Sequence, residues 1–360
     1  MTDNNKTRIV VGLSGGVDSS AAASLLVEQG YDVVGITLKV WPQDCVARAE
    51  DKCCGPQAVM DARSVADKLD IPYYLVDESK EFQRDVIDYF AAEYKAGRTP
   101  NPCVMCNEKL KFGNLIDRAR KLGAEYVATG HYARLEQRDG RTVLLRGRDA
   151  RKDQTYFLFS LGQEQLAHMM FPLGELQKSE TREVARCVNL KTAEKQESQE
   201  ICFVPDKDYK KFLTTAGLVE EHRGEIVDTR GQVLGHHDGI EFYTIGQRKG
   251  LGISSPSPMY VIELDPENNR VVVGGEELLL RDEFRIDRCN WIAFDHLAKP
   301  IEASAAIRYN HPGTEATVIP GENGQATVKL REPQRAVTPG QACVFYQDDL
   351  VVGGGGIMRN

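Results

Sequence analysis

One seven-residue stretch near the N-terminus, SGGVDSS at 14–20, limits what this chain can fold into more than any other feature. It follows a short apolar run rich in β-branched residues, 8–13, and it opens a segment with helical spacing, 19–29. Glycines let a backbone approach an anion closely, and the N–H groups and Ser hydroxyls at a helix start face that anion. The sequence therefore predicts a strand, a phosphate-binding loop and a helix, with Asp18 either holding Mg²⁺ or orienting the loop.

This loop lacks the lysine of the GxxxxGK[ST] pattern, which disfavours ordinary phosphate-loop hydrolysis. In its position after a strand, SGGVDSS resembles the signature of the PP-loop ATP pyrophosphatases. That family cleaves ATP between the α and β phosphates and transfers AMP to an oxygen of the substrate. The alternative is a glycine-rich turn without a ligand, and seven consecutive matching residues disfavour it.

Strand and helix patterns alternate through the first third of the chain. Further strands are expected at 32–40, 72–76 and 126–129, and a helix is expected at 107–122. This order predicts an α/β domain with a mostly parallel sheet covered on both faces, and ligands then bind at the carboxyl ends of the strands.

The pattern changes after about residue 130. A hairpin is expected at 132–146, with Asp139-Gly140 at its turn, and short strands with many Gly and Pro dominate from about 207. These short strands predict a small C-terminal β-barrel or sandwich, and the glycine run 353–356 is expected to form a tight turn beside the last strand.

Composition restricts the class of protein. The chain has 360 residues and a net charge of -8, it contains no apolar run long enough to span a membrane, and its N-terminus lacks a secretory pattern. A cytoplasmic protein of two or three domains, without membrane association, is expected. Between Arg84 and Asp153, fifteen Lys or Arg stand against ten Asp or Glu, which suits either a local nucleic-acid contact or an ordinary charged surface.

Nine cysteines in such a chain favour reactive thiols, metal ligands or small buried side chains over a disulfide framework. Cys106 is expected beside the N-terminus of the helix at 107–122, where the helix dipole and nearby lysines favour a thiolate. A fold that brings Cys106 and Cys202 together would pair two thiols beside the nucleotide. The alternatives for Cys106 are a buried thiol or a structural zinc ligand completed by Cys103, His131 and Cys202.

The remaining cysteines carry weaker predictions. Cys187, Cys289 and Cys343 lie in apolar or structured contexts and are interpreted as packing residues. No role is assigned to Cys45, Cys53 and Cys54.

Seven motifs, in order along nearly the whole chain, together resemble the tRNA-specific 2-thiouridylase family. They are SGGVDSS (14–20), AGRTPNPCVMCN (96–107), ATGHYAR (128–134), KDQTYFL (152–158), ICF (201–203), TIGQRKGLGI (244–253) and VTPGQACVFY (337–346). The resemblance implies an adenylation and thiolation domain (1–206), a small central domain (207–275) and a C-terminal β-barrel that contacts tRNA (276–360).

The resemblance also implies an activity: conversion of the wobble uridine of certain tRNAs into 2-thiouridine, with ATP and Mg²⁺. The C2 oxygen of the flipped base is adenylated and then replaced by sulfur that an upstream cysteine desulfurase or sulfur-relay protein supplies. Cys202 would carry the persulfide, and Cys106 would be the partner nucleophile.

Binding residues follow by position from the same resemblance. The ATP-binding residues would be Gly12, Leu13, Ser14, Gly15, Gly16, Val17, Asp18, Ser19, Leu38 and Gly130. The target base would be lined by Asn101, Pro102 and Cys103. The tRNA contacts would be His131, Lys152, Asp153, Gln154, Arg308, Tyr309 and Gln341.

Cys103 departs from the family pattern, because many members have Asp there as a proposed acid/base group. The resulting Cys-x-x-Cys opens a second mechanism, in which Cys103, Cys106 and Cys202 hold three irons of a [4Fe-4S] cluster. Two other classes of function stay open. An ATP-dependent amide or amidine synthetase would need neither Cys106 nor Cys202, and a non-catalytic RNA-binding protein would form no AMP.

Overall fold

The structure is a computed structural model that describes residues 6–40, 55–195, 201–204 and 208–359. Cys45, Cys53, Cys54 and the expected boundary at 206/207 lie outside the described residues. The chain divides into two compact units, each described by itself. The first unit comprises Met1–Val86, Cys103–Pro205 and Asp349–Val351, and the second comprises Ile87–Pro102, Asp206–Asp348 and Val352–Asn360.

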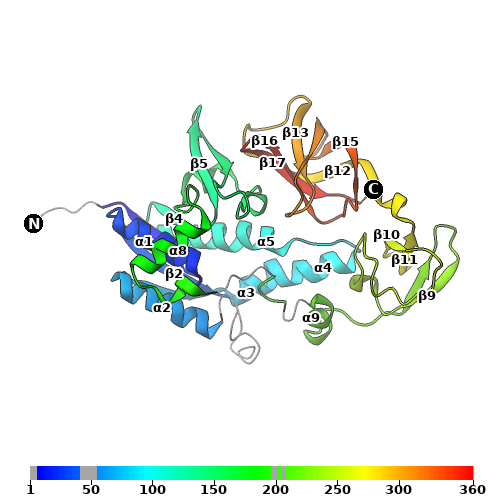
Figure 1. The fold of residues 1–360 in the computed structure, drawn as a ribbon, viewed down its shortest axis with the longest axis horizontal. Coiled ribbons are helices and arrows are strands. Elements are labelled where there is room, and N and C mark those ends of the chain that lie inside the picture. The colour runs from blue at the N-terminus through cyan, green and yellow to red at the C-terminus, as the bar shows by residue number, and fades with distance from the viewer. Residues whose placement is uncertain (1–5, 41–54, 196–200, 205–207, 360) are drawn as a thin grey trace, which may run out of the picture. The chain divides into compact units, whose positions relative to one another are not determined.

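A five-stranded, all-parallel sheet forms the centre of the first unit, as the sequence predicted (Figure 1). Its order is β3-β2-β1-β4-β7, with β1 (Arg8–Gly12), β2 (Asp32–Lys39), β3 (Tyr73–Asp77), β4 (Tyr126–Ala128) and β7 (Met169–Met170). Ile9 and Val11 of β1 are fully buried and share one hydrophobic core with helix residues such as Leu26 and Ala62. Burial of this kind is typical of parallel strands that helices cover.

The helical segments of this unit connect and cover the strands. They are α1 (Val17–Glu28), α2 (Pro56–Leu69), α3 (Ser79–Phe82), α5 (Pro102–Met105), α6 (Leu115–Lys121), α7 (Gln163–Ala167) and α8 (Lys178–Cys187), with the 3₁₀ turns η4 (Thr155–Phe157) and η5 (Lys191–Glu194) and the π-helical turns η2 (Gln83–Asp88) and η3 (Cys106–Asn114).

The helix expected at 107–122 begins earlier than the sequence predicted. Helical structure starts at Pro102 and continues through α5, η3 and α6. Proline favours the first turn of a helix, because its φ is already helical and the missing N–H has no partner to lose there. Cys103 and Cys106 therefore lie within a helical segment, and the prediction that Cys106 precedes the helix is wrong.

The predicted hairpin is confirmed. Strand β5 (Ala133–Arg138) pairs antiparallel with β6 (Arg141–Arg146). Asp139 and Gly140 between them have φ values of 49° and 76°, as a two-residue turn of this type requires.

The second unit contains a four-stranded sheet and a β-barrel, with helices α4 (Tyr89–Lys95) and α9 (Tyr209–Thr215). The sheet has the order β10-β11-β8-β9. Its elements are β8 (Gly224–Val227), β9 (Val233–His237), η7 (Ile240–Phe242), β10 (Tyr260–Asp265), β11 (Arg270–Gly274) and η8 (Glu276–Leu279). Tyr94 of α4 stacks on Tyr209 of α9 with ring centroids 4.7 Å apart.

Six C-terminal strands form a closed barrel, which confirms the predicted architecture (Figure 1). The order is β12-β15-β14-β13-β16-β17, and β17 pairs back onto β12. The strands are β12 (Leu280–Trp291), β13 (Ile301–Ala306), β14 (Thr314–Pro320), β15 (Ala326–Arg335), β16 (Ala342–Gln347) and β17 (Leu350–Ile357). The side chains of Val318, Val328 and Phe345 fill its interior.

The glycine run 353–356 lies inside β17, so the predicted tight turn is wrong. A Cβ added to Gly353 would lie 2.3 Å from the carbonyl oxygen of Asn290, and one on Gly355 would lie 2.7 Å from that of Asp287. Both neighbours belong to β12, whose pairing with β17 is irregular between Asp287 and Asn290. The glycines therefore let two strands close the barrel at short range.

No helix within the described parts of the chain is both long enough and apolar enough to cross a membrane.

Candidate active site

The glycine loop is fixed to the sheet by the residues at its start. The amide of Leu13 donates to the carbonyl of Ile36 at 2.8 Å, and the hydroxyl of Thr37 donates to the carbonyl of Leu13 at 2.6 Å. Tyr73 donates to Thr37 at 2.8 Å. The loop therefore leaves the carboxyl end of β1 in one defined direction, at the edge of the sheet where ligands of parallel α/β domains bind.

Serine hydroxyls brace the loop internally. The amide of Ser14 donates to the hydroxyl of Ser19 at 3.1 Å, and the hydroxyl of Ser20 donates to the carbonyl of Gly16 at 2.7 Å. Gly15 has φ +69°, and a Cβ there would lie 2.2 Å from the carbonyl oxygen of Ala58 in α2. Gly130 is also constrained, because a Cβ there would lie 2.6 Å from the amide nitrogen of Ser19.

The N-terminus of α1 opens directly from this loop. Gly16 is its N-cap, and no side chain among the described residues caps it. Val17, Asp18 and Ser19 form the first turn, whose N–H groups have no intrahelical acceptor. Such a turn attracts an anion both through these donors and through the helix dipole.

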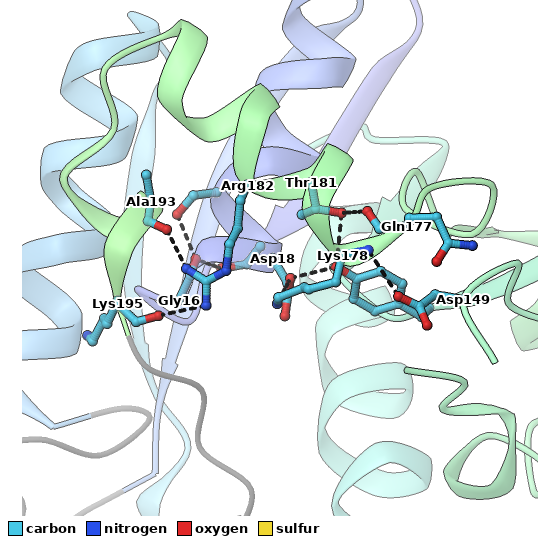
Figure 2. A network of polar contacts seen from close by, with 12 residues as sticks. Gly16, Asp18, Asp149, Gln177, Lys178, Thr181, Arg182, Ala193 and Lys195 are labelled. Carbon is cyan, nitrogen blue, oxygen red and sulfur yellow. Dashed lines mark hydrogen bonds and ion pairs between the residues drawn. The ribbon is translucent and has the colours of Figure 1, made fainter. Parts of the chain in front are cut away.

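Two residues distant in sequence hold Asp18, the acidic residue of that turn. The ammonium group of Lys178 lies 2.6 Å from Asp18 Oδ1 (Figure 2). The hydroxyl of Tyr132 lies 3.0 Å from the same oxygen. Tyr132 is also 2.9 Å from the hydroxyl of Thr181 in α8. The buried carboxylate of Asp149 accepts the backbone N–H of Lys178 at 3.0 Å and thereby fixes the start of α8.

A second lysine reaches the other side of the loop. The ammonium group of Lys195 lies 3.2 Å from the carbonyl oxygen of Gly15 and 2.7 Å from Asp61 Oδ2. Arg182 of α8 donates to the carbonyls of Ala193 and Lys195, at 2.6 and 3.3 Å (Figure 2). Sequence reasoning missed both lysines, because more than 150 residues separate them from the loop and no local motif marks them.

Leu38, the last of the predicted ATP-binding residues, lies on β2 beside Val76 of β3 and is half-buried. The predicted nucleotide-binding residues thus gather on one end of the sheet, around β1, β2 and the start of α1, and all of them belong to the first unit.

The two thiols of the Cys-x-x-Cys motif lie in the helical segment that begins at Pro102. Cys103 and Cys106 are both half-buried. Burial raises the pKa of Cys103 to about 11, Lys111 lowers it, and nearby Cys106 raises it further. At neutral pH the thiol form of Cys103 therefore predominates, and its role in place of the family's aspartate stays a prediction.

Cys202 is half-buried, and it belongs to the same unit as Cys106. The ring of the next residue, Phe203, packs edge-on against Phe82 of α3, with centroids 5.7 Å apart. Helix α3 in turn packs against η3, the helical turn that begins with Cys106. The buried carboxylate of Glu78 links the same elements, because it accepts hydrogen bonds from Asn114 at 2.6 Å and Arg118 at 3.1 Å.

The side chains that could ligate a metal ion are spread over the fold. Within the described ranges, no three side chains of His, Cys, Asp or Glu converge as they would around a metal ion. Cys103, Cys106 and Cys202 are thus not gathered around one point in the described residues, with or without His131, and the [4Fe-4S] and zinc ligand sets stay predictions.

Two of the predicted tRNA contacts lie inside the protein. His131 and Asp153 are each only 9% exposed. Burial lowers the pKa of His131 well below its ordinary value, and Thr129 lies 2.8 Å from its Nδ1. Asp153 accepts hydrogen bonds from Arg146 at 2.8 Å and Thr155 at 2.9 Å. These contacts give both residues a structural role, and their contact with tRNA stays a prediction.

The other predicted contacts occupy more accessible positions. Lys152 is half-buried, and Gln154 accepts the backbone N–H of Tyr132 at 3.0 Å. In the second unit, Arg308 and Tyr309 are exposed directly after β13. The side chain of Gln341 donates to the carbonyls of Thr99 and Pro100, at 2.9 and 3.3 Å.

Of the residues predicted to line the target base, Asn101 is half-buried and Pro102 is buried. They lead directly into α5 and Cys103. The segment that precedes them is held by Gln341 and by a hydrogen bond from the Thr99 amide to the carbonyl of Pro339 at 2.8 Å.

Comparison with known proteins extends these observations to the whole chain. Three family models match in succession: tRNA methyl transferase HUP domain (7–206), tRNA methyl transferase PRC-barrel domain (210–275) and aminomethyltransferase beta-barrel domain (281–357). Among solved structures, a 4-thiouridine synthetase in complex with RNA and ATP covers 59% of this chain and 50% of its own, at 18% identity. Its TM-score of 0.34 is too low to indicate a shared overall fold.

Curated relatives are much more similar. The tRNA-specific 2-thiouridylase MnmA of Clostridium perfringens is 50% identical over 97% of this chain and 98% of its own length. The protein of the same name from Moorella thermoacetica is 51% identical over 97% and 98%. Identity at this level over nearly the full length leaves no domain of either protein unmatched, and the chain therefore belongs to the tRNA-specific 2-thiouridylase family.

Proposed function

We propose that this chain is an ATP-dependent tRNA-uridine 2-sulfurtransferase that forms 2-thiouridine at the wobble position. The observation that carries the proposal is 50% identity to named 2-thiouridylases over 97% of the chain, with the glycine loop placed at the start of α1. The family model for residues 7–206 has a name that refers to methyl transfer, and the experiment below therefore tests that reaction as well.

ATP is the substrate that suits the loop. The open first turn of α1 and the glycines at 15 and 16 favour a phosphate group, and the predicted residues from Gly12 to Ser19, with Leu38 and Gly130, are proposed to bind the nucleotide. Asp18 is paired with Lys178 and is proposed to orient the loop, whereas Mg²⁺ would be held by the phosphates of ATP and would neutralise charge on the leaving pyrophosphate.

Adenylation makes a poor leaving group into a good one. The C2 oxygen of the flipped uracil attacks the α-phosphorus of ATP and releases pyrophosphate. The terminal sulfur of a persulfide on Cys202 then attacks C2, and AMP departs. The Cys106 thiolate attacks Sγ of Cys202, which releases the thiolated base and forms a Cys106–Cys202 disulfide. An external thiol reductant supplies the two electrons that restore both thiols.

The convergence of the two thiols is supported by packing. Phe203 contacts Phe82 of α3, and α3 packs against the helical turn that begins at Cys106. Lys195 contacts the loop at Gly15, and Cys202 follows seven residues later, within about 25 Å of chain even when fully extended. The persulfide mechanism is therefore preferred to the cluster mechanism, whose three ligands are not gathered in the described residues.

RNA recognition is proposed for both units. Arg308 and Tyr309 are exposed, and they suit a phosphate contact and stacking on a base. Lys152 is the charged candidate in the first unit, whereas His131, Asp153, Gln154 and Gln341 would act by shaping the surface. A local basic zone in a chain of net charge -8 favours selective binding.

The three domains are proposed to have the functions that the family resemblance implies for them. Residues 1–206 would carry adenylation and thiolation, 207–275 the small central domain and 276–360 the barrel that contacts tRNA. A cysteine desulfurase or sulfur-relay protein would deliver the sulfur. The odd number of cysteines, nine, disfavours a disulfide framework, which suits the cytoplasm as the compartment.

The test combines purified protein with tRNA and one co-substrate at a time: ATP with a persulfide donor, ATP with ammonium, or S-adenosylmethionine. We expect 2-thiouridine and one AMP per thiolated base only with ATP and persulfide, detected by mass spectrometry of nucleosides. Methylated uridine with S-adenosylmethionine, or product with ammonium, would contradict the proposal, as would tRNA binding without AMP formation.

A further inference from the structure

The glycine loop has no positively charged side chain to offset the charge of a bound phosphate. ATP carries several negative charges, and the only charged residue among the loop residues 14–20 is the acidic Asp18. The lysine that other phosphate loops place within the motif is missing. Cations that offset the phosphate charge must therefore come from elsewhere in the chain.

The structure places two lysines at this loop, from opposite directions. Lys178, at the start of α8, is 2.6 Å from Asp18 and only 12% exposed at its side chain. Lys195, beyond η5, is 3.2 Å from the carbonyl oxygen of Gly15. We propose that these lysines set the charge of the nucleotide loop: Lys178 is a positioning residue that neutralises Asp18, and Lys195 is a phosphate-binding residue. This inference rests on the proposed function, because it assumes that the loop binds ATP.

Helix α8 fixes the positions of both lysines. Lys178 and Arg182 are four residues apart and share one face of α8. Arg182 fixes the backbone at Ala193 and Lys195, while Asp149 fixes the backbone of Lys178. The contacts of α8 with α1 therefore set both ammonium groups relative to the loop (Figure 2).

The two lysines have different partners, which predicts different roles. Lys178 pairs with the loop's own carboxylate, and without it Asp18 would repel the phosphates at short range. Lys195 touches the loop backbone itself, and its partner Asp61 belongs to α2, outside the loop. An ammonium group has three N–H donors, so Lys195 has a donor beyond those that meet Gly15 and Asp61 for a phosphate oxygen.

A series of nucleotides separates phosphate binding from a structural role. Titration calorimetry of ATP, AMP and adenosine is compared for wild type and Lys195→Met. We expect ATP affinity to fall at least about tenfold, as for loss of a charged hydrogen bond, and adenosine affinity to stay within about twofold. Equal losses for all three ligands, or no loss for ATP, would overturn the role of Lys195.

A double substitution tests Lys178. We expect Lys178→Met to weaken ATP binding about tenfold, and Asp18→Asn added to it to recover most of that loss, because no unpaired carboxylate then remains. No recovery in the double variant would overturn the neutralising role. For Lys195→Met, the corresponding addition of Asp61→Asn should recover nothing, and recovery there would overturn direct phosphate binding.

Two controls keep the result interpretable. Lys329→Met removes a lysine from an exposed ion pair, 3.1 Å from Glu283 in the barrel, and should leave ATP affinity unchanged. Thermal unfolding without ligand shows whether each variant is folded, and Lys195→Arg should restore ATP affinity to within about threefold because it keeps the charge. Wild type that fails to bind ATP would refute the proposed function itself, whereas normal ATP binding by both Met variants would refute only this inference.

Discussion

The side-chain nitrogen of Gln341 lies 2.9 Å from the carbonyl oxygen of Thr99 and joins the start of β16 to the segment that leads into Asn101 and Cys103. Gly340 makes the approach possible, since its φ is +89° and a Cβ there would lie 3.0 Å from the backbone of Thr99. The barrel loop thus acts as a support for the segment proposed to line the target base.

We predict that Gln341→Ala slows single-turnover thiolation while the tRNA dissociation constant stays within about twofold, because the lost hydrogen bonds position the segment at 99–101. Gln347→Ala removes a similar bond, 2.8 Å to the carbonyl of Glu302, and should change neither quantity. A large loss of tRNA affinity with an unchanged rate would instead make Gln341 a direct tRNA contact.

Gly15→Ala should be more destabilising than Gly30→Ala. Both glycines have positive φ, +69° and +86°, so alanine at either position costs about 1–2 kcal/mol in backbone strain. Only at Gly15 does the added Cβ meet backbone, 2.2 Å from the oxygen of Ala58, which adds about 1–3 kcal/mol. Urea unfolding of both variants measures the difference. Equal losses of stability would show that the loop can shift away from Ala58 without a cost in free energy.

Cys103 should react slowly with iodoacetamide at pH 8. Its raised pKa of about 11 means that the neutral thiol predominates below that pH, and the reactive thiolate appears only as the pH approaches 11. Mass spectrometry of alkylated peptides across pH 7 to 11 measures this, with the exposed Cys187 as reference. Alkylation of Cys103 at pH 8 as fast as that of Cys187 would contradict the burial effect.

Tyr132→Phe should weaken the link between the loop and α8. The hydroxyl lies 3.0 Å from Asp18 and 2.9 Å from Thr181, and the residue is 2% exposed. Its removal leaves the buried hydroxyl of Thr181 without this partner and takes one hydrogen bond from the half-buried Asp18, so we expect a loss of about 1–3 kcal/mol in the free energy of unfolding and weaker ATP binding. An unchanged free energy of unfolding would mean that Lys178 alone holds Asp18.

Much of the fold was predictable because its signals are local. The apolar run at β1, the glycine loop and the turn at Asp139-Gly140 each specify backbone conformation within a few residues. The strand Leu280–Trp291 was not predicted, because its solvent-facing positions carry charged residues that hide the apolar ones. The glycines of β17 suggested a turn, and only their close packing on β12 explains them.

The site was predictable only where it is contiguous in sequence. The loop and the Cys-x-x-Cys motif are read directly, whereas Lys178 and Lys195 reach Asp18 and Gly15 through tertiary packing. The burial of His131 is likewise a property of the packed core, where Phe112 and Phe171 surround its ring. No spacing in the sequence carries that information.

The most direct test of the central claim is one turnover of protein that carries a ³⁵S persulfide on Cys202, mixed with tRNA and ATP under anaerobic conditions. We predict labelled 2-thiouridine, one AMP for each labelled base and a Cys106–Cys202 disulfide in the peptide map, with Cys106→Ser and Cys202→Ser inactive and no iron in the active protein. Full activity of either Ser variant, or label transfer that requires iron, would contradict the account.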